Sequence, residues 1–242
     1  MKNLSKLFLG LVLIIMASSF QQPIQNSTYA AYLSGSMQLW ERSIAQAQQQ
    51  YESSKSNEAR FDLAMTMYGG MSATMKDQDE DFFDQYVDDA MDHLDELIDQ
   101  DFRVADCKAI QSGIYGFKIA YSPWKGMFLG PKSNSTIEDA MEENPNSPIV
   151  QKLYGNSKLF TPETWGGDKE EAVKAYEKAV LLYKNQEGSD NDWMFLDTYA
   201  WLGQAYQAIN KKDKAKETYL ASLEIEKDFN WVNYVLLPQV SK

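Results

Sequence analysis

Few side chains in this sequence could perform covalent or metal chemistry. The chain has one histidine and one cysteine. His93 lies one helical turn from Asp89 and close to Glu96, a spacing that could hold a metal ion, although a lone histidine among acids is typical of a solvated helix face. These acids are expected to raise the pKa of His93. Cys107 is expected to be buried in a helix as a small hydrophobic group, and no histidine follows it as a general base.

A second candidate is the acidic run that contains Asp77, Asp79 and Asp81. An EF-hand calcium loop requires glycine at its sixth position and glutamate at its twelfth, where this chain has Phe82 and Asp88. The run therefore favours the start of a helix, whose dipole the acids complement.

The remaining composition argues against most enzyme classes. The 35 acidic residues single out no pair for glycoside hydrolysis, and the sequence contains no nucleophile–base pair, metal-ligand set or phosphate-binding loop. A formal net charge of −12 argues against nucleic acid or an anionic membrane surface as the main partner. We expect no catalysis, no cofactor and no metal site.

Two segments rich in tryptophan and glycine are the best candidates for recognition. They are residues 123–132 and 162–168. Aromatic rings, lysines and flexible glycines could form a pocket or a partner surface. Alternatively, the tryptophans fill gaps between helices and the glycines permit tight turns. The candidate binding residues are Trp124, Lys125, Phe128, Lys132, Trp165 and Asp168.

The elements that carry these segments are predicted to be helices. Apolar residues recur at spacings of three and four over Asn57–Lys76 and Asp79–Asp99, and Tyr29–Tyr51 is rich in helix-forming residues. Gln21–Thr28 is expected to be a short extended lead-in. No segment shows the sustained alternation of a strand.

Local signals predict where some helices begin and end. Ser135 with Glu138, and Asp168 with Glu171, have the spacing of capping boxes. Pro145 indicates the end of one helix, and Pro148 indicates the start of the next.

The strongest pattern is internal repetition. Its last unit has small and aromatic residues at the offsets of the 34-residue tetratricopeptide repeat (TPR), from Gly203 and Tyr206 to Ala215, Tyr219 and Ser222. Small residues at these positions let two antiparallel helices approach closely, and the aromatic residue fills the gap between them.

Two earlier segments align with each other. Tyr115-Gly116 matches Tyr154-Gly155, and a proline follows each glycine by seven residues. Both segments carry five more residues between their two helices than the last unit does, and these additions fall where the tryptophan-bearing segments lie. A weaker unit surrounds Tyr68-Gly69-Gly70. Because one repeat cannot bury its own apolar face, the units are expected to stack into a solenoid.

We therefore predict an all-α solenoid of about four antiparallel helix pairs, plus an N-terminal helix. The expected divisions are a lead-in and N-terminal helix over 20–56 and repeat units over 57–102, 103–145, 146–189 and 190–232, within a repeat domain over 57–242. The alternative is a non-repeating helical bundle with similar apolar stripes.

Three segments, Ser122–Ser133, Glu143–Pro148 and Pro162–Asp168, resemble secreted TPR proteins of Gram-negative envelopes. The resemblance covers about residues 57–232. It implies a right-handed solenoid, export to the periplasm and a role in binding or scaffolding a protein partner. A more distant similarity, to periplasmic TPR partners of solute transporters, implies the alternative of a small-ligand-binding protein.

The N-terminus predicts the compartment. Lys2 and Lys6 precede an apolar run, Leu7–Met16, that is too short to span a membrane and has the length of a signal-peptide core. We expect residues 1–19 to be removed after Ser19, which makes the protein periplasmic or secreted. The alternative is an uncleaved N-terminal anchor.

Overall fold

The computed structural model describes residues 24–186 and 188–241, and within these ranges the regular structure is helical. The predicted signal segment, residues 1–19, lies outside them. A first helix covers residues 24–34. The helices that follow are α2 (Met37–Ser54), α3 (Asn57–Thr74), α4 (Glu80–Asp99), α5 (Val104–Tyr121), α6 (Gly126–Glu143), α7 (Pro148–Phe160), α8 (Lys169–Lys184), α9 (Trp193–Ala208), α10 (Lys212–Ile225) and α11 (Leu237–Val240). Short 3₁₀ turns, η1 (Pro123–Lys125), η2 (Glu163–Trp165) and η3 (Ser189–Asn191), and a π-helical turn, η4 (Val232–Leu236), connect some of them.

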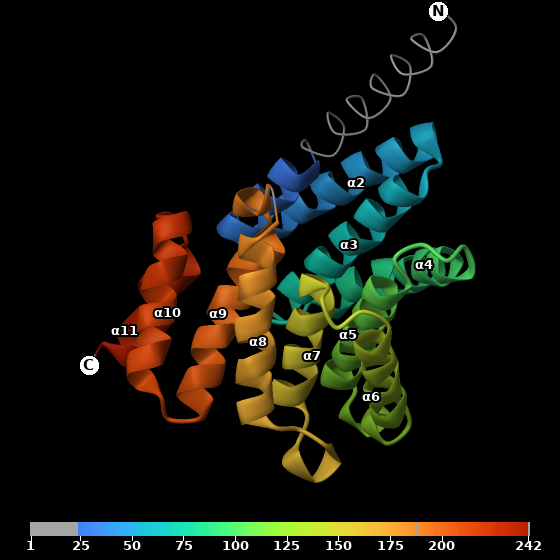
Figure 1. Cartoon of the computed structure of the whole chain (residues 1–242). Coiled ribbons are helices and arrows are strands. Elements are labelled where there is room, and N and C mark those ends of the chain that lie inside the picture. Colours follow the sequence, from blue (N-terminus) through green and yellow to red (C-terminus); the bar gives the residue numbers. More distant parts are fainter. Residues whose placement is uncertain (1–23, 187, 242) are drawn as a thin grey trace, which may run out of the picture.

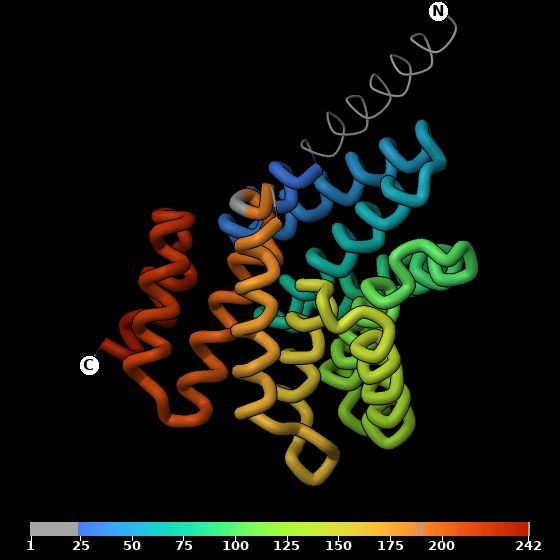
Figure 2. Tube along the Cα trace, in the orientation of Figure 1, coloured from blue at the N-terminus to red at the C-terminus, as the bar shows by residue number. Residues whose placement is uncertain are grey.

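Consecutive helices stack as hairpins, which confirms the predicted all-α solenoid. Figure 1 shows α5 and α6, then α7 and α8, then α9 and α10 side by side, with α3 and α4 before them. The turns within the last three pairs lie along the same lower edge, as the chain trace in Figure 2 also shows. Among the described helices, none combines the length and apolar character that crossing a membrane requires.

The N-terminal region differs from the sequence-based expectation. The expected extended lead-in is wrong from residue 24 onward, because residues 24–34 are helical. The expected single helix over Tyr29–Tyr51 is broken at Gly35, whose φ of +62° suits glycine. Ser36 then begins α2 by accepting a hydrogen bond from the Leu39 backbone N–H.

The predicted caps have mixed outcomes. Asp168 begins α8 as predicted, since its carboxylate accepts a 2.9 Å hydrogen bond from the Glu171 N–H. Asp79 likewise caps α4, which is the helix-start interpretation of the acidic run. The predicted cap at Ser135 is wrong. Ser135 lies within α6, and its hydroxyl donates to the Lys132 carbonyl.

Ser135 cannot cap a helix because α6 already begins at Gly126, well before the predicted cap. Lys125 and Gly126 both have right-handed helical backbone angles, so the turn η1 continues directly into α6. Most of residues 123–132 therefore extend a helix rather than form a loop. The second insertion does form a turn, through η2 and Gly166, whose φ is +97°.

Close approach between paired helices explains the repeat signature. A Cβ atom at Gly155 would lie 2.8 Å from Cε1 of Tyr176, and one at Gly203 would overlap the Tyr219 ring. Gly155 and Gly203 lie on the first helix of their pair and the tyrosines on the second. Gly116, which the sequence aligns with Gly155, has nothing within 4 Å of such an atom.

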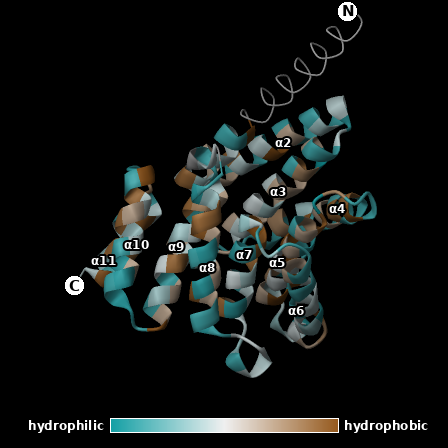
Figure 3. Ribbon diagram, viewed as in Figure 1, coloured by the Kyte–Doolittle hydropathy of each residue, from teal (hydrophilic) through white to brown (hydrophobic). Residues whose placement is uncertain are grey.

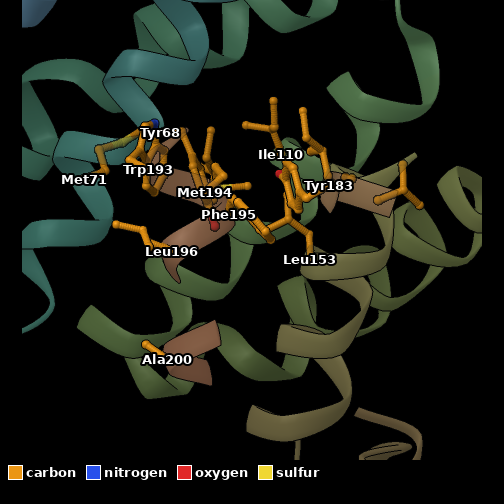
Figure 4. Packing of buried hydrophobic residues seen from close by; sticks show 14 of the residues in the cluster. Tyr68, Met71, Ile110, Leu153, Tyr183, Trp193, Met194, Phe195, Leu196 and Ala200 are labelled. Carbon is orange, nitrogen blue, oxygen red and sulfur yellow. The ribbon is translucent and has the colours of Figure 1, made fainter. Parts of the chain in front are cut away.

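The core continues without interruption from the N-terminal helices into the repeats. Figure 4 shows Trp193 of α9 beside Tyr68 of α3, with Phe195 and Tyr183 further along. Trp193 also contacts the Trp40 ring edge-on, with centroids 5.5 Å apart. Hydrophilic residues, by contrast, gather on outer surfaces such as the start of α10 (Figure 3).

Substitution of the close-contact glycine should destabilise the protein. We predict that Gly203→Ala lowers the free energy of unfolding by about 1–3 kcal/mol, because the added methyl group overpacks the α9–α10 contact. Gly116→Ala is the matched control, because Gly116 also lies in a helix but has free space around the added methyl group. This change should raise the free energy of unfolding by about 1 kcal/mol or less, since alanine favours a helix more than glycine does. Urea unfolding measures both, and equal effects would contradict the packing account.

Candidate functional site

The two tryptophan-bearing segments lie next to each other. The Asn134 side chain on α6 donates a 3.1 Å hydrogen bond to the Trp165 carbonyl in η2. A Cβ atom at Gly130 would lie 4.0 Å from Cε3 of Trp165, so the Trp165 ring lies over this part of α6. The structure thus brings together the two segments at one edge of the solenoid, where the turns of neighbouring hairpins meet (Figure 1).

The aromatic side chains at this edge are exposed rather than packed. Trp124 and Phe128 are each 68% exposed, and Trp165 is 51% exposed. A ring that filled a gap between helices would be nearly buried, as Trp193 is at 4%. The packing interpretation of Trp124 and Trp165 therefore does not describe these rings.

Two further apolar side chains belong to the same edge, although the sequence analysis did not select them. Met127 is exposed on the first turn of α6, and Phe160 is exposed at the end of α7, just before the second segment. Both residues are close in sequence to the tryptophan-bearing segments, and this proximity could have identified them from the sequence alone. We call the group of Trp124, Met127, Phe128, Phe160 and Trp165 the aromatic edge.

Other rings continue the aromatic edge toward the C-terminal pair. Phe160 contacts Trp201 of α9 edge-on at 4.9 Å between centroids, and Trp201 contacts Trp231 at 5.7 Å. Both tryptophans are partly buried against the core, so the contact with Trp201 connects the exposed Phe160 to the core.

Lysines accompany the aromatic edge. Lys125 is half-buried beside Trp124, and Lys132 is exposed one helical turn after Phe128. The Lys132 ammonium lies 4.8 Å from the centre of the Tyr115 ring, and a hydrogen bond with that tyrosine raises the pKa of Lys132. Lys132 therefore carries a positive charge at neutral pH.

Asp168 and Lys158 have structural contacts at the second segment. The Asp168 carboxylate caps α8, and its backbone N–H donates to the Lys158 carbonyl at 2.9 Å. The Lys158 ammonium pairs with Glu138 of α6 at 3.0 Å and reaches the Gly166 carbonyl at 3.5 Å. Among the sequence-predicted site residues, Asp168 thus has a capping role that accounts for its position.

The environments of Cys107 and His93 affect the protonation of the two side chains in different ways. Cys107 is fully buried, and burial raises the pKa of its thiol to about 12, so it stays protonated. The expected rise in the pKa of His93 is wrong. Burial and the Arg60 guanidinium lower it, and the ring packs edge-on against Tyr51 at 5.3 Å. In the part of the chain that the structure describes, no group of three or more His, Cys, Asp or Glu side chains is placed to hold a metal ion.

Comparisons with known proteins agree with the repeat pattern. The tetratricopeptide repeat profile matches residues 166–186 and 196–229, so the C-terminal part of the chain carries such repeats. No curated protein matches the sequence.

Similar solved structures show the same fold. A thermophilic TPR protein of Thermus thermophilus has a TM-score of 0.60 at 16% identity, over 91% of this chain and 98% of its own. The HusA haemophore of Porphyromonas gingivalis has a TM-score of 0.62 at 18% identity, over 77% of this chain and 93% of its own.

Exposure predicts how tryptophan substitutions affect stability. We predict that Trp124→Ala and Trp165→Ala each change the free energy of unfolding by about 0.5 kcal/mol or less, as surface substitutions do. Trp193→Ala should cost about 3–5 kcal/mol, because it empties a buried site. Thermal unfolding followed by circular dichroism gives the comparison, and a large loss for Trp165→Ala would show that this ring is part of the architecture.

Proposed function

We propose that the protein is a non-catalytic scaffold that binds a protein partner through the aromatic edge. The observation that carries the proposal is the exposure of Trp124 and Phe128 at 68% each, next to a half-exposed Trp165. Contiguous exposed apolar groups of this kind mark interaction sites. Tryptophan, phenylalanine and methionine are also enriched at the centres of protein interfaces.

The charges near the aromatic edge indicate the chemistry of the partner surface. Lys125 and Lys132 follow Trp124 and Phe128 in the sequence. These cations stand out in a chain with a formal net charge of −12. A partner that offers an apolar anchor with acidic groups around it would complement this edge.

The repeats support the same class of function. Tetratricopeptide repeats stack into extended surfaces that contact other proteins. The buried thiol of Cys107 stays protonated, which does not suit a nucleophile. A scaffold requires no reactive group of this kind.

The alternative function, a small-ligand-binding partner of an envelope transporter, has weaker support. HusA is named as a haemophore, but its similarity to this chain is 18% identity and extends to the fold alone. The aromatic edge is an open surface, which suits a protein better than an enclosed small molecule.

We further propose that the scaffold acts in the periplasm or outside the cell. Lys2, Lys6 and the apolar run Leu7–Met16 support an export signal removed after Ser19. The intact mass of the protein from an envelope fraction tests this, and retention of Met1 would contradict it.

The partner is best sought by affinity capture from an envelope fraction. We predict that the wild-type chain retains a specific protein and that the double variant Trp124→Ser, Phe128→Ser loses at least about nine-tenths of it. The reason is that aromatic anchors at an interface centre carry most of the binding free energy. Quantitative mass spectrometry measures the retained protein.

Leu181→Ser provides the matched control, since Leu181 is also an exposed apolar side chain but lies near the end of α8, about 18 Å along the helix from its start beside the turn that holds Trp165. The control should retain the partner fully. If the double variant, shown to be folded by circular dichroism, captures the same proteins as the wild type, the aromatic edge is not the binding surface.

A further inference from the structure

The outer face of α10, in the last hairpin of the solenoid, carries an open groove of about 490 Å³ (Figure 1). The groove is lined by Asp213, Lys216, Glu217, Leu220, Ala221 and Glu224. These residues recur at spacings of three and four, so they form one face of the helix. Helix α9 and the elements η4 and α11 pack against α10 elsewhere, and this face stays exposed to solvent.

An apolar side chain lies at the middle of the face. Leu220 is 46% exposed, and Ala221 beside it is partly exposed. A single exposed leucine is ordinary on a protein surface and identifies no partner. The charges on either side of Leu220 therefore decide what could cover this face.

The charges of α10 are distributed against the helix dipole. The dipole favours acidic residues at the start of a helix and cations at its end. In α10 the lysines gather at the start, and the last turn has no basic residue. The lysines are Lys211, Lys212, Lys214 and Lys216, and the acidic residues at or just after the other end are Glu224, Glu226 and Asp228. Such a distribution suits a neighbouring helix that has the same charges and runs in the opposite direction.

At equal distances on the two sides of Leu220, the charges are opposite. Four pairs of positions have this relation: Lys216 and Glu224, Lys214 and Glu226, Asp213 and Lys227, and Lys212 and Asp228. Over residues 212–228, Glu217 is the one charged residue without a charged counterpart, since Leu223 lies opposite it. A two-fold axis beside Leu220 would therefore place opposite charges of two copies level with each other.

The charge balance of this segment also permits two copies to approach. Residues 211–228 contain five lysines and five acidic residues, whereas the whole chain has a formal net charge of −12. Two copies that met through a more acidic surface would repel each other. Lys216 and Glu224 are exposed, and neither belongs to an ion pair within the described part of the chain. Both side chains can therefore pair with another molecule.

We propose that this face of α10 is a dimerisation surface, on which a second copy of the chain lies with its α10 antiparallel and a two-fold axis beside Leu220. In a dimer of this symmetry the same patch meets itself. Lys216 of each copy lies level with Glu224 of the other, about 6 Å along the helix from the contact between the two Leu220 side chains. Complementary charges of this kind fix the register of an interface.

Sedimentation equilibrium of the purified protein tests the proposal. We expect the wild type to form dimers as its concentration rises. Lys216→Glu and Glu224→Lys should each raise the dissociation constant of the dimer at least about tenfold, because each places like charges level with each other at both ends of the contact. The double variant Lys216→Glu, Glu224→Lys should return to within about threefold of the wild type, because the exchange keeps opposite charges together.

Lys169→Glu is the matched control. It makes the same change in net charge as Lys216→Glu, at an exposed lysine in the first turn of α8. This variant should dimerise like the wild type. A wild-type chain that stays monomeric at every concentration, a double variant as weak as its single variants, or an equal loss in Lys169→Glu would overturn the proposal.

A cysteine at the axis tests the geometry itself. Leu220→Cys should form a disulfide-linked dimer under mild oxidation, because a residue at a two-fold axis meets its own copy within disulfide reach. Cys107, the single native cysteine, is buried and should not contribute. Leu181→Cys, at the exposed Leu181 of α8, is the control and should stay monomeric on a non-reducing gel. Equal crosslinking of both variants, or none in Leu220→Cys, would contradict the assignment.

This dimer is separate from the scaffold function. The double variant Trp124→Ser, Phe128→Ser changes the aromatic edge and should dimerise like the wild type. Its loss of the captured partner tests the aromatic edge alone, and the charge exchange at Lys216 and Glu224 tests α10 alone. If the aromatic-edge variant lost dimerisation while the α10 variants kept it, the second copy would lie on the aromatic edge and the assignment to α10 would be wrong.

Discussion

Lys152 on α7 and Asp197 on α9 form an ion pair inside the solenoid, and the arrangement of the other elements depends on it. Nζ and Oδ2 lie 2.7 Å apart, and the side chains are 2% and 5% exposed. The Tyr32 hydroxyl, from the helix at 24–34, donates a 3.0 Å hydrogen bond to the other oxygen of Asp197. Burial and Asp197 raise the pKa of Tyr32 well above its usual value, so the hydroxyl keeps the proton that it donates.

This network constrains three distant segments at once. Removal of either charge would leave the other buried and uncompensated, which typically costs about 3–5 kcal/mol. The two hairpins that contain α7 and α9 and the N-terminal helix must therefore keep one register. Tyr32 and Trp40 also cover Trp193, so the N-terminal helices are part of the same core rather than an appendage to it.

The constraint places two different surfaces at opposite ends of the repeats. At one end, the N-terminal helix and the starts of α5, α7 and α9 enclose a polar cavity. At the other end, the turns between paired helices carry exposed rings that no part of the described core covers. Helix α7, which Lys152 pairs with α9, runs from the cavity wall at Pro148 to Phe160 of the aromatic edge.

Short-range patterns in the sequence predicted much of the fold. The Gly203–Tyr219 spacing identified a close helix pair because it reflects one local contact. The segments around Trp124 and Trp165 have equal positions in successive repeats, and the stacking expected from the repeats accounts for their adjacency. The start of α6 at Gly126 was missed because a 3₁₀ turn can continue into a helix without a capping side chain.

The features that depend on distant residues could not be predicted in this way. Lysine is rarely buried, so no local pattern indicated that Lys152 would pair with a residue two helices later. The lowered pKa of His93 likewise arises from burial and from Arg60, which lies on another helix. The cavity combines side chains from separate stretches of chain, whose proximity only the packed solenoid establishes.

Site-specific photocrosslinking in intact cells tests the central claim, that the aromatic edge is a recognition surface, most directly. A benzophenone amino acid would replace Phe128 or Trp165 and, in a separate chain, the exposed Leu181 of α8. The account predicts the same discrete adduct from positions 128 and 165, which lie on adjacent hairpins, and none of that mass from position 181. Different adducts from the two edge positions, or no adduct from either of them, would contradict it.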